Sequence, residues 1–382
     1  MLIVHLILAA VAVATVALRP RSNPAAAALI VVAALDLALG GSAGPVLRVV
    51  GPLVLFLCAA LSLAKLVARS GLAERAARLL AAAARGRALA LYALACVLCA
   101  CLTAAVSLDG AVVLMVPILL VLKDRFSAPI RPLFLGVVAV ANAASIALPQ
   151  GNPTNLVVIA RLGLSPAAFT ARMLLPGLSA AALCAVLIAA LERRALAVAY
   201  RPPRYERTPL SRTERGAAIV FAAAAIAAWI APIFGIAPWW PFSAVVAVAV
   251  ARNHRELTIP YRIAIQVLAL LVAIHSLGLN PPPTPDGLLG LLEVAGAVTA
   301  VAAVANNLPA SIWAGSLLAG QAGYAASIGL AIGSMATPQG SVATLIAADL
   351  AGDSAPAYPT ARFALIAGGA VVIATLLVWA GL

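Results

Sequence analysis

The sequence Leu148-Pro149-Gln150-Gly151-Asn152-Pro153-Thr154-Asn155-Leu156 is a polar, proline-containing interruption of an otherwise apolar segment. A second interruption with the same Pro-Gln-Gly core lies near the other end of the chain, Thr337-Pro338-Gln339-Gly340-Ser341-Val342-Ala343-Thr344-Leu345. Inside a bilayer the backbone groups freed by such a break have no water to bind, so the break must line a cavity or be buried in protein. Two breaks in corresponding places of two halves indicate a transporter binding site formed by an internal repeat.

The composition around these breaks is that of a membrane protein. Of the 382 residues, 64% are hydrophobic and 10% are charged, and the mean hydropathy is +1.10. The apolar residues form long runs separated by short charged loops, which predicts an all-α polytopic membrane protein. A net charge of +13 would suggest nucleic acid binding in a soluble protein. Here the arginines lie in loops beside apolar runs, where they set membrane orientation, so no nucleic acid partner is expected.

The N-terminal run and the cysteines each have two interpretations. Residues 1–18 could be a secretory signal, but no basic residue precedes the apolar run and the cations follow it, which favours a retained first span with an outside N-terminus. All five cysteines lie in apolar segments and are expected to be small buried hydrophobes rather than disulfide or zinc ligands. Cys96 and Cys99 share a helix face that could bind a thiophilic metalloid, but Cys101 does not share it.

Apolar runs of about 20 residues predict ten spans and two re-entrant hairpins. The first hairpin, 89–122, is interrupted at Ser107-Leu108-Asp109-Gly110, and the second, 288–318, at Asn306-Asn307-Leu308-Pro309. The first could instead be two ordinary spans with a buried turn, although cations at both of its ends favour the hairpin. The predicted spans are 1–18, 24–40, 45–68, 132–163, 171–191, 216–232, 239–250, 263–279, 322–350 and 361–380.

The positive charges test this topology. All but three of the 25 lysines and arginines fall on one side, the inside, and only Arg48, Arg161 and Arg172 fall outside. Both termini are then outside, in the cell membrane, and the first hairpin opens inward and the second outward, so the two halves are inverted internal repeats with broken helices. The expected division is scaffold helices (1–70), first repeat (71–192), cytoplasmic linker (193–215) and second repeat (216–382).

Asp109 is the ionisable residue expected at membrane depth within the repeated core. A buried carboxylate is costly in a membrane and is therefore a functional hypothesis, the alternative being an aspartate in an interfacial loop. It could alternate between protonated and ionised forms as the site faces opposite sides, as a proton-coupled carrier requires. Asp36 and Glu293, also in apolar runs, are either polar contacts between helices or secondary proton sites, and His5 and His275 are expected at the membrane interface.

The two breaks and the second hairpin supply amides and hydroxyls but no fixed cation. Such a lining suits a neutral polyhydroxylated solute or a small ion held by dipoles. Half-helices that begin after Pro153 and Gly340 would direct N–H groups at the cavity, so an anion also fits. The polar residues predicted to line the site are Gln150, Asn152, Thr154, Asn155, Asn306, Asn307, Gln339, Ser341 and Thr344.

These motifs resemble the ion transporter superfamily, which includes citrate and dicarboxylate carriers and sodium/proton antiporters, and they are most similar to its arsenite/antimonite efflux permease branch. The resemblance rests on the two interruptions of the hairpins and the two Pro-Gln-Gly breaks. It implies a transport domain that moves against a scaffold, often in a homodimer. It also implies a substrate site lined by Ser107, Asp109, Gly110, Gly151, Asn152, Asn155, Asn306, Asn307, Gly340, Ser341 and Thr344.

The favoured function is a secondary transporter that exports a trivalent metalloid in exchange for protons. The alternatives are a sodium- or proton-coupled citrate, dicarboxylate or other anion transporter, and a sodium/proton antiporter. An enzyme is not expected, because the sequence pattern offers no nucleophile with a base and no paired carboxylates. The chain has no Gly-x-x-x-x-Gly-Lys-Ser/Thr motif, so any ATPase would be a separate subunit. No cofactor is expected other than a coupling proton or sodium ion, and no metal site.

Overall fold

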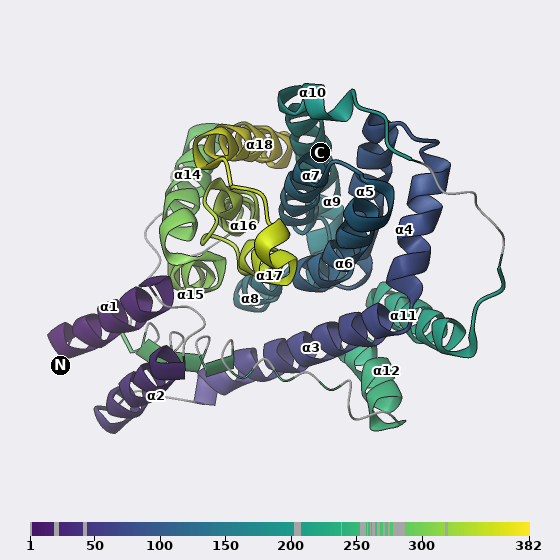
Figure 1. Ribbon diagram of the computed structural model, residues 1–382. Helices are drawn as coiled ribbons and strands as arrows, with labels where there is room; N and C mark the ends of the chain where they lie inside the picture. The colour runs from purple at the N-terminus through teal and green to yellow at the C-terminus, as the bar shows by residue number, and fades with distance from the viewer. Residues whose placement is uncertain are drawn as a thin grey trace.

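The computed structural model describes residues 2–18, 23–40, 44–201, 208–237 and 239–252, some positions between 257 and 277, and residues 287–317 and 320–382. These residues are predominantly helical (Figure 1). The predicted span 263–279 and His275 lie largely outside them. The all-helical class expected from the sequence is confirmed for the described part of the chain.

Two sets of helices share one order of elements. Each set has a pair of helices joined by a tight turn, a helix that breaks before a second short helix, and a long final helix. The first set comprises α5 (Ala88–Ala105), α6 (Leu108–Phe126), α7 (Ile130–Ala144), η1 (Pro149–Gly151), α8 (Pro153–Leu162) and α9 (Pro166–Leu191). The second comprises α14 (Gly287–Ala305), α15 (Asn307–Leu317), α16 (Ala322–Ala331), η4 (Gly333–Ala336), α17 (Val342–Ala351) and α18 (Thr360–Ala380).

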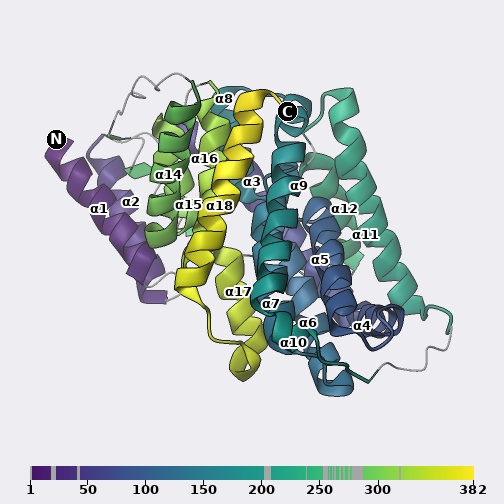
Figure 2. The same cartoon turned by 90° about the horizontal axis from the view of Figure 1, so that it is seen from above.

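The two sets exchange their short helices. The short helix of the first set, α8, packs on α15 and α16 of the second set, and α17 of the second packs on α6 and α7 of the first. Seen from above, α8 lies toward one end of the molecule and α17 toward the opposite end (Figure 2). The breaks that precede these helices therefore lie in the interior, between the ends of the bundle.

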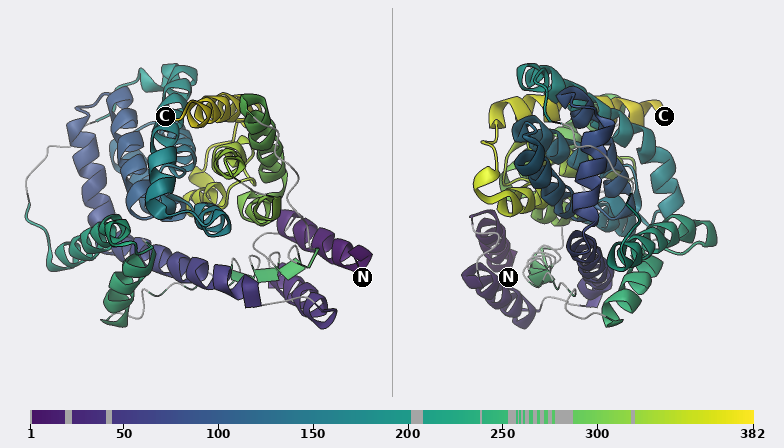
Figure 3. Two further views of the ribbon diagram at one scale, coloured as in Figure 1. Left: turned by 180° about the vertical axis from the view of Figure 1, so that it is seen from behind. Right: turned by 45° about the vertical axis from the view of Figure 1, so that its right-hand side comes forward.

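The remaining helices pack around the two sets. They are α1 (Leu2–Leu18), α2 (Asn23–Ala38), α3 (Gly44–Arg69), α4 (Leu72–Ala83), α10 (Arg193–Leu196), α11 (Arg212–Ile230) and α12 (Trp239–Arg252), with short 3-10 turns η2 (Ala231–Phe234) and η5 (Gly352–Ser354). The long helix α3 runs beneath both sets, as the view from behind also shows (Figure 3). It packs on α6, α11 and α12.

Helix ends are set by local chemistry. The hydroxyl of Ser165 accepts a hydrogen bond from the Ala168 N–H and Pro166 occupies the first turn, which together begin α9. Ser211 and Glu214 form a reciprocal capping box at the start of α11. Gly71, at a left-handed φ of +94°, separates α3 from α4, and the two helices meet at a bend of 70°.

An ion pair joins α4 to α11. Arg75 donates from Nε and Nη2 to the two carboxylate oxygens of Glu214, at 2.9 and 3.1 Å. Its remaining nitrogen, Nη1, and Nη2 also donate to the carbonyls of Thr208 and Pro209. Helix α4 packs on α6, with Ala73, Ala77 and Ala81 buried.

Several described helices are fit to cross a membrane. Five are long and apolar enough, namely α5, α9, α11, α14 and α18, or six if the bent pair α3 and α4 counts as one span. Large apolar side chains on their outer faces are exposed, as Val97, Ile219 and Leu365 show, and a bilayer rather than water suits such surfaces. The described part thus supports a polytopic membrane protein, and the count of ten spans stays a prediction.

Two of the isolated polar residues pair with each other. His5 was expected at the membrane interface, but it is buried, and its Nδ1 lies 2.6 Å from Oδ1 of Asp36. Ser276 Oγ donates to the other oxygen of Asp36. Asp36 is therefore a polar contact between helices, one of the two roles expected for it, because burial of a lone carboxylate there would be unfavourable.

Candidate functional site

The first break is closed by its own side chains. Asn155 donates from Nδ2 to the carbonyls of Ser145 and Leu148, at 2.8 and 2.9 Å, and Asn152 donates to Ser145 Oγ at 3.1 Å. The Asn152 side chain also accepts from the Thr154 N–H at 3.0 Å and so caps α8. These bonds satisfy backbone groups that the interrupted helix would leave unpaired.

The first break is also bound to the turn of the first hairpin. Gln150, 3% exposed, donates from Nε2 to the Ala104 carbonyl at 3.0 Å. Ser107 follows that carbonyl at φ +133° and accepts from the Gly110 N–H. Asp109 lies in the first turn of α6 and is 3% exposed. The first-hairpin and first-break residues of the predicted site thus lie in one buried region.

The second break is held by the second hairpin instead. Asn306 donates from Nδ2 to the Gln339 carbonyl at 2.8 Å, and the Asn307 N–H donates to the Gly340 carbonyl at 2.7 Å. Thr337 Oγ1 donates to the Ala303 carbonyl and accepts from the Gly340 N–H. Asn306 has φ +80°, so each hairpin turn has a non-glycine residue at positive φ immediately before its second helix.

One close approach is the same in both breaks. A Cβ on Gly151 would lie 2.4 Å from the Ser145 carbonyl oxygen, and a Cβ on Gly340 would lie 2.1 Å from the Ser334 carbonyl oxygen. Both serines donate their hydroxyls back to a carbonyl three residues earlier. Only glycine therefore fits at either position without movement of the backbone.

Five residues of the predicted site carry buried oxygens that accept or donate no hydrogen bond within the described structure. Buried polar atoms almost always have a partner, so these oxygens are placed to receive one from a solute, an ion or water. They come from both breaks and from the second hairpin. They are Thr154 Oγ1, Asn155 Oδ1, Asn307 Oδ1, Ser341 Oγ and Thr344 Oγ1.

The two short helices differ at their N-termini. Asn152 caps α8, whereas Ser341, at the corresponding position of α17, makes no side-chain capping bond. The first-turn N–H groups of α17 are therefore available beside the hydroxyls of Ser341 and Thr344. Uncapped N–H groups, hydroxyl donors and the positive end of a helix dipole together suit an anionic group.

The structure differs from expectation most at the glutamines. Gln150 and Gln339 occupy equivalent positions, but the Gln339 side chain is exposed and only its carbonyl is bound by the hairpin. The sequence interpretation missed two residues, Ser145 and Ser334. Both are fully buried, and their carbonyl oxygens lie against Gly151 and Gly340. Alignment of the breaks a few residues further upstream would have found them, because both read Ser-x-Ala-x-Pro-Gln-Gly.

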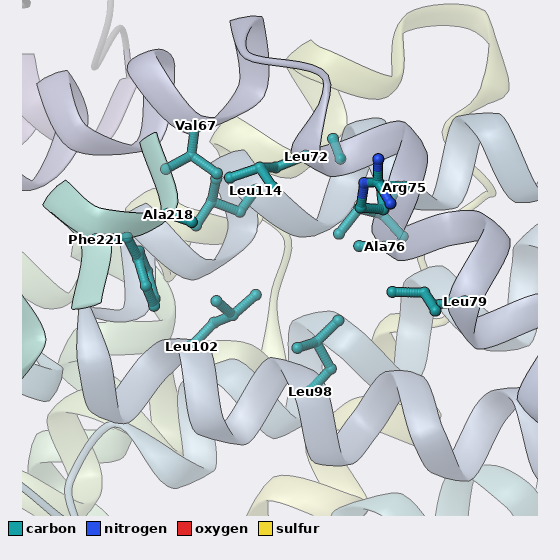
Figure 4. A pocket seen from close by; sticks show the side chains of 12 residues that line it. Val67, Leu72, Arg75, Ala76, Leu79, Leu98, Leu102, Leu114, Ala218 and Phe221 are labelled. Carbon is teal, nitrogen blue, oxygen red and sulfur yellow. The ribbon is translucent and has the colours of Figure 1, made fainter. Parts of the chain in front are cut away.

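An apolar cavity of about 240 Å³ lies apart from the breaks, between α3, α4, α5, α6 and α11 (Figure 4). Val67, Leu98, Leu114 and Phe221 are among the side chains that line it. Its one cation, Arg75, is already bound to Glu214. This cavity offers no polar group for a charged solute, so it is not the candidate site.

Two broken helices with buried polar groups inside an apolar bundle are typical of membrane transporters. The sequence profile described as citrate transporter matches residues 3–330 of the chain. The protein belongs to this citrate transporter family, which supports the superfamily predicted from the motifs and consists of transporters rather than enzymes. The matched range ends before the second break at Thr337. None of the curated proteins matches the chain.

Proposed function

We propose that the protein is a secondary active transporter that moves a small carboxylate anion of the citrate class across the cell membrane, coupled to protons or sodium ions. The observation that carries the proposal is the uncapped N-terminus of α17, with the unpartnered oxygens of Ser341 and Thr344 beside it. Hydroxyl and N–H donors can bind a carboxylate without a fixed cation. The family match supports the same solute class.

The coupling ion is proposed to bind near the first break and the hairpin turns. The amide oxygens of Asn155 and Asn307 can only accept hydrogen bonds or ligate a cation, and both lack a partner within the described structure. Buried amide oxygens suit sodium, whereas Asp109 suits a proton. A bound cation would offset the charge of the carboxylate, which is unfavourable at bilayer depth.

Alternating access follows from the proposed topology. In this proposal the first hairpin opens inward, the second opens outward, and the two sets of helices form inverted repeats that move against the scaffold of residues 1–70. The exchange of α8 and α17 between the sets supports movement of both breaks as one unit. An ion gradient drives the cycle, so no ATPase subunit is required, and a homodimer would pair through the scaffold.

The second candidate is arsenite or antimonite efflux. It is favoured by the motif Asn306-Asn307-Leu308-Pro309 and by the absence of lysine and arginine from both break sequences, since a neutral trihydroxylated solute needs only hydrogen bonds. We rank it second because the family match is to citrate transporters and because the uncapped N-terminus of α17 suits a negatively charged solute.

Thermal unfolding of the purified protein separates the candidates. A ligand that binds only the folded state at 100 times its dissociation constant stabilises it by about 2.7 kcal/mol. We expect citrate or another carboxylate to raise the melting temperature, with an increment from sodium or from acidification, and arsenite and antimonite to leave it unchanged. The double variant Ser341→Ala/Thr344→Val should fold and lose the response. Stabilisation by arsenite alone would replace the carboxylate proposal with the second candidate.

Asp109→Asn tests the proton role. If Asp109 carries the coupling proton, the variant should fold but lose pH-dependent transport in proteoliposomes, because an amide cannot exchange a proton at that site. Asp124→Asn, an exposed carboxylate at the end of α6, is the matched control and should transport normally. Unchanged pH dependence in Asp109→Asn would assign coupling to another group.

A further inference from the structure

A polar cavity lies where α9 and α16 begin and α18 ends. Its volume is about 430 Å³. The C-terminus lies toward the same end of the molecule as α8 (Figure 2). The cavity is lined by Ala168, Ala171, Arg172, Gln321, Tyr324 and Gly381.

Three polar side chains line this cavity from two helices, Arg172 from α9 and Gln321 and Tyr324 from the start of α16. The structure gives the guanidinium of Arg172, the amide of Gln321 and the hydroxyl of Tyr324 no hydrogen bond or ion pair with any other described residue. The ring of Tyr324 packs on Phe169, with ring centroids 6.1 Å apart, which fixes the direction of its hydroxyl. The cavity therefore presents a cation and two neutral donors together, the combination that binds carboxylates.

Two helix starts and one helix end lie at the cavity, so the positive ends of two helix dipoles outnumber the negative end of α18. Helix α9 begins at Pro166 and α16 at Ala322, so both helix dipoles have their positive ends near the cavity. Gln321, the residue before α16, makes no side-chain capping bond, and the N–H groups of Gly323 and Tyr324 donate to the carbonyls of Gly320 and Gln321. Arg172 lies one to two turns into α9, so its charge reinforces the potential of that helix end.

We propose that this cavity captures the carboxylate solute from the outside before it reaches the second break. The inference rests on the proposed function, since it concerns the same anion. Helix α16 joins the two places: it begins at the cavity and leads to the break after Ile332, about 16 Å away at 1.5 Å per residue. Arg172 is one of only three cations that the charge distribution places outside. Because the break sequences contain no cation, Arg172 supplies the long-range attraction that the transport site lacks.

The kinetic test uses Arg172→Gln and Arg172→Lys in proteoliposomes with citrate supplied outside. We expect Arg172→Gln to raise KM about 5-fold at low salt with kcat within 2-fold, and the increase to shrink at high salt because exposed charges are screened. Arg172→Lys should retain most of the affinity. Arg362→Gln removes an exposed cation near the start of α18 and should match the wild type. An unchanged KM in Arg172→Gln, while the wild type transports citrate, would overturn the capture site alone.

A binding experiment separates this inference from the proposed function. In Ser341→Ala/Thr344→Val, equilibrium dialysis with labelled citrate in phospholipid-free detergent should detect weak residual binding, and the added Arg172→Gln change should abolish it. Residual binding that persists without Arg172 would contradict the inference. If Arg172 matters only when anionic phospholipid is present, the guanidinium binds a lipid phosphate instead, which also overturns it. If the wild type neither binds nor transports any carboxylate, the proposed function fails and the capture site fails with it.

Discussion

The two breaks share a backbone but not a set of hydrogen bonds. In each break a helix ends, and the carbonyl of a serine packs on the glycine six residues later. The short helix that follows packs on helices of the other set. In the first break, Asn152 and Asn155 bond to the break itself. In the second break, the corresponding residues are Ser341 and Thr344, whose oxygens have no partner within the described structure. The hairpin residue Asn306 provides the support instead.

This difference suggests that the first break serves mainly to hold its backbone and the second mainly to bind a ligand. The amide donors of the first break are used to satisfy backbone carbonyls, which stabilises the broken conformation. In the second break that support comes from the hairpin, so its own hydroxyls and the N-terminus of α17 are left for a ligand. We infer that substitutions in the first break will act mainly on stability and those in the second mainly on transport.

The largest expected effect is at the shared glycines. In Gly151→Ala and Gly340→Ala the new methyl group would meet a backbone carbonyl at 2.4 and 2.1 Å, and a rigid neighbour cannot move away cheaply. Overpacking costs about 1–3 kcal/mol, so we expect a loss near the upper end of that range, greater for Gly340→Ala, and transport below detection. The melting temperature of the detergent-solubilised protein would measure the loss of stability.

Gly368→Ala is the matched control for the glycines. Gly368 lies within α18, and a Cβ there would meet no atom within 4 Å. Alanine is favoured over glycine in a helix by about 0.5–1 kcal/mol, so this variant should melt at the same or a higher temperature. Equal destabilisation by all three substitutions would show that the serine contacts are not what requires glycine.

An intermediate effect is expected where the breaks differ. Asn155→Leu leaves the Ser145 carbonyl unpaired, whereas the Leu148 carbonyl keeps the bond from the Gly151 N–H. The variant should lose about 2 kcal/mol of stability, since a buried group left without a partner costs about 1–3 kcal/mol. Thr344→Val removes a hydroxyl that makes no protein hydrogen bond. It should leave the melting temperature nearly unchanged but lower citrate transport about 10-fold. The comparison fails if Thr344→Val is the more destabilising of the two.

The smallest effect is expected at the glutamines. Gln150→Leu loses the bond to the Ala104 carbonyl and should cost about 1 kcal/mol. Gln339→Leu changes an exposed side chain and should stay within about 0.5 kcal/mol of the wild type. Denaturant or thermal unfolding of the two variants side by side would measure the difference, and identical losses would remove the asymmetry between the breaks.

The positions of the breaks were readable from the sequence because Pro and Gly interrupt helices by their own covalent chemistry. Helices end and restart at Pro149–Pro153, at Thr337–Ser341 and at Asn306, where the polar residues lie. The class of protein and its superfamily followed from the same residues. The expected count of ten spans and the division into scaffold and repeats stay predictions.

Contacts between distant segments were not readable. The exposure of Gln339 and the burial of Gln150 depend on which hairpin turn each break meets, and the two residues have identical neighbours in sequence on both sides. The roles of Ser145 and Ser334 depend on a backbone approach to a glycine, which their own side-chain chemistry does not indicate. The pairing of His5 with Asp36 likewise joins two helices, and nothing in their apolar sequences indicates that these two side chains meet.

The exchange of α8 and α17 has a consequence for biosynthesis. When the ribosome has completed α8, the helices that it packs on, α15 and α16, have not yet been translated. The nascent first half must therefore wait in the membrane with one short helix undocked, until nearly the whole polypeptide has emerged. Assembly of the native bundle is accordingly a late, single event, and a chain cut between the halves would need both pieces together to reach it.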